Sequence, residues 1–141
     1  MNKDVFDKQA RTRAFPVADF LGISFNPPSA GLVIAQFRPA PEHRNPMGTL
    51  HGGILCDLAD AAMGVAFAST LGAEESFTTL ELKMNFLRPV WDSPLTAEAQ
   101  ILSRGRNVGV MECKITDEKQ RLIAKASSTC LVLAGEAAKN R

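Results

Sequence analysis

The fold and chemistry of this chain depend on one stretch, Asn45-Pro46-Met47-Gly48-Thr49-Leu50-His51-Gly52-Gly53, which leads directly into an alanine-rich segment with an acidic residue at Asp60. Two glycines at the start of a helix leave its first N–H groups uncovered. Those donors, with the positive end of the helix dipole, suit a carbonyl oxygen that is gaining negative charge. A carboxylate on the same helix supplies a base or a nucleophile. This stretch therefore contains the parts of an acyl-transfer site.

A long helix is predicted directly after this stretch, over residues 54–71. The segment has no proline, and Leu55, Leu58 and Ala62 recur at helical spacing. Gly72 follows it, as glycine commonly follows the end of a helix. Small residues occupy nearly every side of this helix, whereas a helix with one face in water normally has a polar back. We therefore expect the helix to be almost wholly enclosed.

Extended segments are predicted on both sides of the helix. They span residues 31–37, 77–87, 94–103, 107–117 and 120–133. The segment 94–103 shows the signal most clearly, because Leu95, Ala97 and Ala99 alternate with polar residues at the period of a strand with one covered face. Short loops separate the last three segments, so we expect these to form an antiparallel meander.

A long central helix wrapped by a curved antiparallel sheet is the hotdog arrangement, an α+β fold. The whole chain, 1–141, is expected to be a single domain, with a helical segment over 1–19 that Pro16 punctuates and a polar tail at 135–141 that frays. Such a sheet has edges and an open face that a partner must cover. We therefore expect a homo-oligomer, either a homodimer or a homotetramer built as a dimer of dimers.

Composition excludes several classes of partner. The chain has 16 Lys+Arg against 15 Asp+Glu, so no overall field attracts nucleic acid or an anionic membrane. No run approaches the ~18 apolar residues of a membrane span, and the N-terminus lacks a signal peptide's apolar core, which favours the cytoplasm. The cysteines are expected to be reduced core residues: Cys56, Cys113 and Cys130. The two histidines, His43 and His51, form no ligand pair, so neither a metal nor a cofactor is expected.

The motif residues resemble one known family. Asn45, Gly48, His51-Gly52-Gly53 and Asp60, with the segment Thr79-Leu80-Glu81-Leu82-Lys83-Met84-Asn85-Phe86-Leu87-Arg88-Pro89, resemble the hotdog-fold acyl-CoA thioesterases. The resemblance is greatest to the phenylacetate-pathway subgroup and its medium- and long-chain relatives, and it covers residues 20 to 133. It implies hydrolysis of an acyl-CoA to a free carboxylic acid and coenzyme A, at sites that lie at a dimer interface.

The resemblance also implies roles for individual residues. Asp60 corresponds to the catalytic carboxylate, and Asn45 to the amide that places the carboxylate or a water molecule. The backbone N–H of Gly52, or that of Gly53, corresponds to the donor that polarises the thioester carbonyl. A hydroxyl on the following strand assists. Counting back from Arg88-Pro89 selects Thr79 for it, whereas counting forward from Asp60 selects Thr78.

Two further groups of residues have both a functional and a structural interpretation. His51 is either a catalytic base or an imidazole that hydrogen-bonds the turn, and the chain has no Gly-x-Ser-x-Gly elbow that would place it in a triad. Three arginines near loops, Arg88, Arg104 and Arg106, with Asn107 beside them, suit the phosphates of coenzyme A. The alternative for these arginines is that they only make a turn soluble.

The sequence leaves several mechanisms and functions open. Asp60 is a general base in one mechanism and a nucleophile that forms an acyl-enzyme anhydride in the other. A hotdog dehydratase or hydratase is a competing enzyme class, although that branch pairs a His with a carboxylate across a proline-rich motif. A non-catalytic module that binds or senses acyl-CoA is the alternative outside enzymology. The acyl group is not readable from the sequence, because the phenylalanines and Met63 suit either a pocket or the core.

Overall fold

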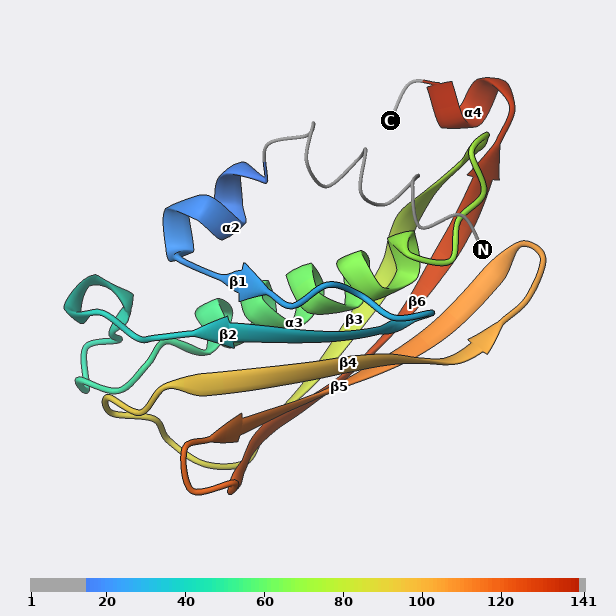
Figure 1. Ribbon diagram of the computed structural model, residues 1–141. Helices are drawn as coiled ribbons and strands as arrows, with labels where there is room; N and C mark the ends of the chain where they lie inside the picture. Colours follow the sequence, from blue (N-terminus) through green and yellow to red (C-terminus); the bar gives the residue numbers. More distant parts are fainter. Residues whose placement is uncertain (1–14, 140–141) are drawn as a thin grey trace.

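Residues 15–139 are described by the computed structural model, and they form one curled antiparallel sheet around a helix (Figure 1). The sheet has six strands in the order β1-β2-β4-β5-β6-β3. The elements are α2 (Pro16–Leu21), β1 (Ser24–Phe25), β2 (Leu32–Phe37), the 3-10 helix η1 (Pro41–His43), α3 (Gly52–Ala68), β3 (Glu75–Phe86), β4 (Leu95–Arg104), β5 (Val108–Asp117), β6 (Leu122–Ala134) and α4 (Glu136–Lys139). The predicted hotdog fold is confirmed.

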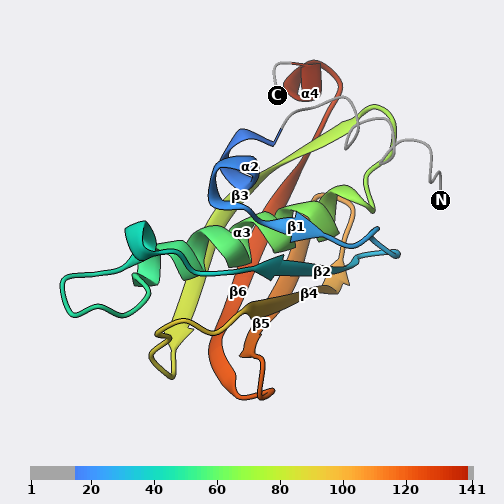
Figure 2. The same cartoon turned by 60° about the vertical axis from the view of Figure 1, so that its left-hand side comes forward.

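Small side chains on the sheet let α3 lie close to it. Ala97 and Ala99 on β4 are completely buried, and they pair across strands with Ala35 and Val33 of β2. From the helix, Leu58 and Met63 fill the space between the two layers. Figure 2 shows α3 running across β5 and β6 on the concave side of the sheet. Apolar burial in this layer is the main favourable term for the fold.

Phe67 anchors the C-terminal end of α3. A Cβ added to Gly109 of β5 would lie 2.2 Å from Cε2 of the Phe67 ring, so only glycine leaves room for this ring. The Arg104 guanidinium covers the ring from another side, 5.2 Å from its centroid. This packing fixes the axial position of the helix, because a ring that is completely buried cannot slide along the sheet.

The ends of the helices differ from the sequence predictions. Helix α3 starts at Gly52 and ends at Ala68, before the predicted stop at Gly72. The hydroxyls of Ser69 and Thr70 donate back to the carbonyls of Ala66 and Phe67, at 2.7 and 2.8 Å, and so compete with a further helical turn.

The predicted terminal segments are described only in part. Within the described part of the predicted segment 1–19, Pro16 begins helix α2, because the fixed φ of proline suits the first helical position. Residues 1–14 lie outside the described residues. The tail that was expected to fray, 135–141, contains the short helix α4, with an ion pair between Lys139 and Glu136. Residues 140–141 are also outside the described part.

The expected enclosure of α3 is wrong for the single chain. Its sheet-facing side is buried, but Gly53, Asp57 and Asp60 are exposed on the opposite side. The sheet curls around only one side of the helix, as Figure 1 shows. The acidic side chains of the helix therefore lie on an open face.

The predicted strands are present within two residues at each end, and β3 adds a feature that the sequence did not reveal. β3 pairs with β6 and forms one edge of the sheet. The register shifts between Thr79 and Glu81, so Leu80 is an extra residue in a β-bulge. Thr79 pairs with Cys130 and Leu82 pairs with Ser128, both of which are buried. The bulge therefore points Thr79 and Leu82 to the same, helix-facing side of the strand.

Candidate active site

The first turn of α3 is capped by a side chain. His51 is the N-cap residue, and its Nδ1 accepts a hydrogen bond from the Gly53 N–H at 2.9 Å. Its own backbone N–H donates to the His43 carbonyl at 2.9 Å. These contacts favour the structural interpretation of His51. They also separate the two candidate glycines, because the Gly53 N–H is occupied, whereas the Gly52 N–H meets no acceptor among residues 15–139.

Asn45 builds the loop that leads into this turn. Its Oδ1 accepts from the N–H groups of Met47 and Thr49 at 3.0 and 3.2 Å, and its Nδ2 donates to Thr49 Oγ1 at 2.8 Å. The backbone at Gly48 has φ +87°, a conformation that glycine adopts at no steric cost. The predicted site amide is thus part of a tight turn, directly before the oxyanion candidate in the chain.

Asp60 lies two turns further along α3, on the exposed face. Loss of hydration to neighbouring protein atoms raises the pKa of Asp60, and the nearby Asp57 carboxylate raises this pKa further. A carboxylate that holds its proton to higher pH than usual is better suited to proton transfer near neutral pH. The Asp60 environment is therefore favourable for a catalytic acid or base.

Thr79 and Cys130 lie on the same side of the molecule as Asp60. The Thr79 hydroxyl is 3.7 Å from Cys130 Sγ. Burial is the main cause that raises the pKa of the Cys130 thiol, and the Asp60 charge raises it further. Thr79 on β3 is therefore in contact with Cys130 on β6, and the charge of Asp60 on α3 acts on the same thiol. The arrangement favours Thr79 over Thr78 as the site hydroxyl, because Thr78 pairs with Leu131 and is one position out of phase with the helix-facing side.

The two halves of the predicted site are apart within one chain. Gly52 and Asp60 are eight residues apart on α3, which corresponds to about 12 Å along the axis at about 1.5 Å per residue. A carbonyl oxygen that accepts from the Gly52 N–H is therefore out of reach of the Asp60 carboxylate of the same chain.

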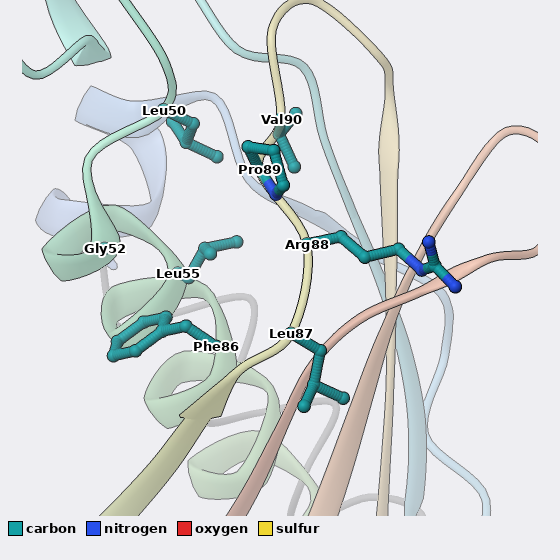
Figure 3. Close-up of a pocket in the computed structure, with 8 residues that line it drawn as sticks. All are labelled: Leu50, Gly52, Leu55, Phe86, Leu87, Arg88, Pro89 and Val90. Atoms are coloured by element: carbon teal, nitrogen blue, oxygen red, sulfur yellow. The ribbon is translucent and has the colours of Figure 1, made fainter. Parts of the chain in front are cut away.

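A cavity of about 290 Å³ lies beside Gly52, which the sequence did not reveal (Figure 3). Its walls include Leu50, Gly52, Leu55, Phe86, Pro89 and Val90. In Figure 3, the Phe86 ring points toward the start of α3, whereas the Arg88 side chain extends away from the cavity. The sequence signal for the cavity was the position of its apolar residues beside the His51-Gly52-Gly53 turn and beside Arg88-Pro89.

The predicted coenzyme A residues differ in their contacts. Arg104 Nη2 pairs with Glu75 Oε2 at 3.1 Å, and Arg104 Nε donates to Thr70 Oγ1 at 3.3 Å. These bonds tie the end of α3 to the β4–β5 hairpin, which favours a structural role for Arg104. By contrast, Arg88 and Arg106 are exposed and form no ion pair with the described residues. Asn107 is exposed as well, and its carbonyl accepts from the Val132 N–H at 2.7 Å.

The cysteines differ in burial, and this affects their reactivity. Burial raises the pKa of Cys113 to about 12, which keeps this thiol protonated. Cys130 is also buried, but Cys56 is only half-buried, so the prediction of core cysteines holds for two of the three. Within 15–139, no group of three His, Cys, Asp or Glu side chains is arranged to hold a metal ion. The helices in this range are too short or too polar to cross a bilayer.

Comparison with known proteins identifies the family. The sequence model of the thioesterase superfamily matches residues 47–124, which include the His-Gly-Gly turn, Asp60 and Thr79. The chain belongs to this superfamily. The 1,4-dihydroxy-2-naphthoyl-CoA hydrolase of Listeria monocytogenes is 30% identical over 112 residues, which are 79% of this chain and 91% of that protein. This superfamily member is therefore a thioester hydrolase, as the resemblance predicted.

Solved structures agree with this assignment. A thioesterase from Haemophilus influenzae superposes with a TM-score of 0.80 at 26% identity, covering 90% of this chain and 87% of that one. A phenylacetic acid degradation-related protein from Ralstonia eutropha gives a TM-score of 0.83 at 28% identity, covering 90% and 98%. Both the predicted fold and the predicted family of this thioesterase are confirmed.

Replacing Asp57 with Asn is expected to move the acid limb of the kcat/KM profile to lower pH. In the mechanism expected from the sequence, the ionised form of Asp60 acts as a base or nucleophile, so a raised pKa of Asp60 removes activity on the acid side. Because the Asp57 charge contributes to that raised pKa, its removal lets Asp60 ionise at lower pH. The shift is partial, since loss of hydration remains.

Initial rates measured across the acid range check this expectation. Asp92→Asn is the matched control, because it removes an exposed carboxylate from the loop after β3. An acid limb that stays in place in Asp57→Asn, or moves to higher pH, would contradict the electrostatic coupling.

Proposed function

We propose that this thioesterase hydrolyses acyl-CoA to a carboxylic acid and coenzyme A, at two equivalent sites of a homodimer. The observation that carries the proposal is the Gly52 N–H, which points out of a helix start beside an apolar cavity and meets no acceptor among the described residues. Hydrolysis of a coenzyme A thioester by the Listeria relative supports the choice of carrier. A carbonyl oxygen at Gly52 would gain both a hydrogen bond and the field of the helix dipole.

In the proposed reaction, the Gly52 N–H binds the thioester carbonyl oxygen. Asp60 of the partner subunit removes a proton from a water molecule, whose oxygen forms a bond to the carbonyl carbon. The electron pair of the C=O bond moves to the oxygen held by Gly52. When the intermediate collapses, the C–S bond breaks and the leaving sulfur takes the proton from Asp60. In the nucleophilic alternative, Asp60 attacks first and water then hydrolyses the anhydride.

The assignment of Asp60 to the second subunit rests on distance and exposure. The separation of about 12 Å along α3 prevents one chain from applying both groups to one carbonyl. The Asp60 face of the helix and the β3 edge are both open in the single chain. Leu80 on β3 is 56% exposed, which suits an edge that a second copy covers. A two-fold axis then gives two identical sites, and a dimer of dimers keeps them.

Asn45 and Thr79 complete the proposed site. Thr79 lies on the Asp60 side of its own chain, where its hydroxyl orients the attacking water. Asn45 holds the turn before Gly52. One hydrogen of its side-chain amide is bound to Thr49, and the other directs the water or the carboxylate of the partner subunit. His51 supports the donor from the Gly53 side and takes no proton in this scheme.

Arg88 and Arg106 are proposed to bind the phosphates of coenzyme A, with Asn107 beside them. Arg88 is one of the residues that line the cavity, and its guanidinium extends outward from it, as Figure 3 shows. A planar guanidinium with free donors matches a phosphate. Arg104 is left out of this group because Glu75 and Thr70 already occupy its donors.

Asp60→Asn is expected to lower kcat by at least about a hundredfold, because it removes the group that transfers the proton or attacks the carbonyl. The variant should fold normally, since Asp60 is exposed in the chain. Release of coenzyme A thiol from aromatic and straight-chain acyl-CoAs is the measurement. Wild-type protein that saturates with every acyl-CoA but releases no thiol would instead be a binding module.

Two inactive variants are expected to restore activity together. Gly52→Pro removes the N–H donor and keeps the local backbone, since proline suits the first helical position and His51 already has the extended backbone that precedes proline. Gly52→Ala is its control, because it adds the same Cβ near Phe86 but keeps the donor. Co-refolding Gly52→Pro with Asp60→Asn makes about half of the dimers mixed, each with one intact site of two.

The mixture should therefore recover roughly a quarter of wild-type activity, whereas each parent alone stays inactive. Native mass spectrometry confirms that mixed dimers have formed. Mixed dimers that remain inactive would place Gly52 and Asp60 in the same site of one chain, contrary to the geometry.

Arg88→Ala is expected to raise KM for acyl-CoA several-fold but to leave KM for the matching acyl-pantetheine thioester nearly unchanged, because only the nucleotide end carries the phosphates that Arg88 binds. Lys114→Ala, which removes an exposed cation from β5, is the control. An equal change for both thioesters would show that Arg88 has a structural role.

A further inference from the structure

The cavity beside Gly52 has a rigid floor and an adjustable rim. Leu50, Leu55 and Val90 form the floor, and their exposed fractions are only 6%, 4% and 4%. The Leu50 N–H donates to the Val90 carbonyl at 2.8 Å, which holds two of these walls together. Phe86 belongs to the rim and is 56% exposed. The floor is therefore part of the core, whereas a substitution of Phe86 leaves the core closed.

The side chains around the cavity are almost all apolar. Leucine, phenylalanine, proline and valine form its walls, and the one charged side chain, Arg88, is turned away from it (Figure 3). The pantetheine arm of coenzyme A carries two amides, which would lose hydrogen bonds to water against such walls. An alkyl or aryl group has no such cost and gains from the burial. The wall chemistry therefore selects the acyl side of the thioester.

Phe86 is the wall residue nearest to the reacting carbonyl. A Cβ built on Gly52 would lie 3.1 Å from Phe86 Cε1 and 3.2 Å from Cζ, so the ring packs directly against the residue that supplies the N–H donor. Phe86 is also the last residue of β3 and pairs with Ala124 of β6, which fixes its backbone. An acyl group whose oxygen accepts from Gly52 therefore lies close to this ring.

Resting on the proposed function, we infer that this cavity binds an apolar acyl group of limited size and that Phe86 is the specificity-determining residue. The volume of about 290 Å³ is at the lower end of ligand cavities, which span roughly 300–1,000 Å³. Short alkyl and single-ring aryl groups match this volume, and the Phe86 ring at the rim obstructs longer chains. A group with a terminal carboxylate would place a charge against apolar walls and is rejected.

The test compares wild type with Phe86→Ala and Phe86→Leu over butyryl-, hexanoyl-, octanoyl-, decanoyl-, benzoyl- and succinyl-CoA. Wild type should prefer the shorter and aryl substrates and reject succinyl-CoA. Phe86→Ala should raise the ratio of kcat/KM for decanoyl-CoA to that for butyryl-CoA by at least about tenfold, and Phe86→Leu by less. Leu102→Ala is the control, because Leu102 is similarly exposed, at 55%, and lies on β4 outside the cavity.

Three results would overturn the inference, and they differ from a failure of the proposed function. Equal loss for all acyl groups in Phe86→Ala would mean that the ring only supports the Gly52 turn. The second result is a Phe86→Ala effect that is absent with acyl-N-acetylcysteamine thioesters, which lack most of the carrier arm. That result would mean that the cavity holds the carrier arm. Efficient wild-type hydrolysis of succinyl-CoA would contradict the apolar assignment. If wild type hydrolyses none of the acyl-CoAs, the proposed function itself fails.

Discussion

The close contact between α3 and the concave face of the sheet is the constraint on which the rest of the structure depends. The small side chains of Ala97 and Ala99 let the helix pack close to the sheet, and Gly109 leaves space for the Phe67 ring at the C-terminal end of the helix. Dense packing of this kind fixes both the position and the rotation of the helix. The rotation decides which residues are covered, and it leaves Asp60 on the open face. The position of the carboxylate is therefore a consequence of core packing.

The elements that repeat a local pattern could be predicted from the sequence. The period of Leu55, Leu58 and Ala62 identified α3, and the alternation around Ala97 identified β4. The helix ends were less accurate, because they depend on single bonds, such as that of the Ser69 hydroxyl with Ala66. The two-residue strand β1 was missed, since a pattern of this length carries no periodicity.

For the candidate site, the sequence supplied the residue types but not their contacts. The motif around His51 indicated a helix start with free donors, yet only the structure shows that His51 occupies the Gly53 N–H and leaves Gly52. Arg104 looked available for phosphate because its partner Glu75 is 29 positions away in the chain. Contacts of this range depend on how the strands are registered, and no local pattern encodes them.

The bulge at Leu80 divides β3 into two halves. Odd-numbered residues such as Thr79 face the helix before the bulge, and even-numbered residues such as Leu82 face it after the bulge. One half presents Thr79 toward Asp60, and the other ends in Phe86 beside Gly52, so each half serves a different part of the molecule. A relative that lacks this one residue would have a regular strand, in which both halves keep the faces that they have here. An alignment of relatives must therefore put any single-residue gap of this strand at position 80. A gap placed elsewhere would equate residues on opposite faces of the sheet.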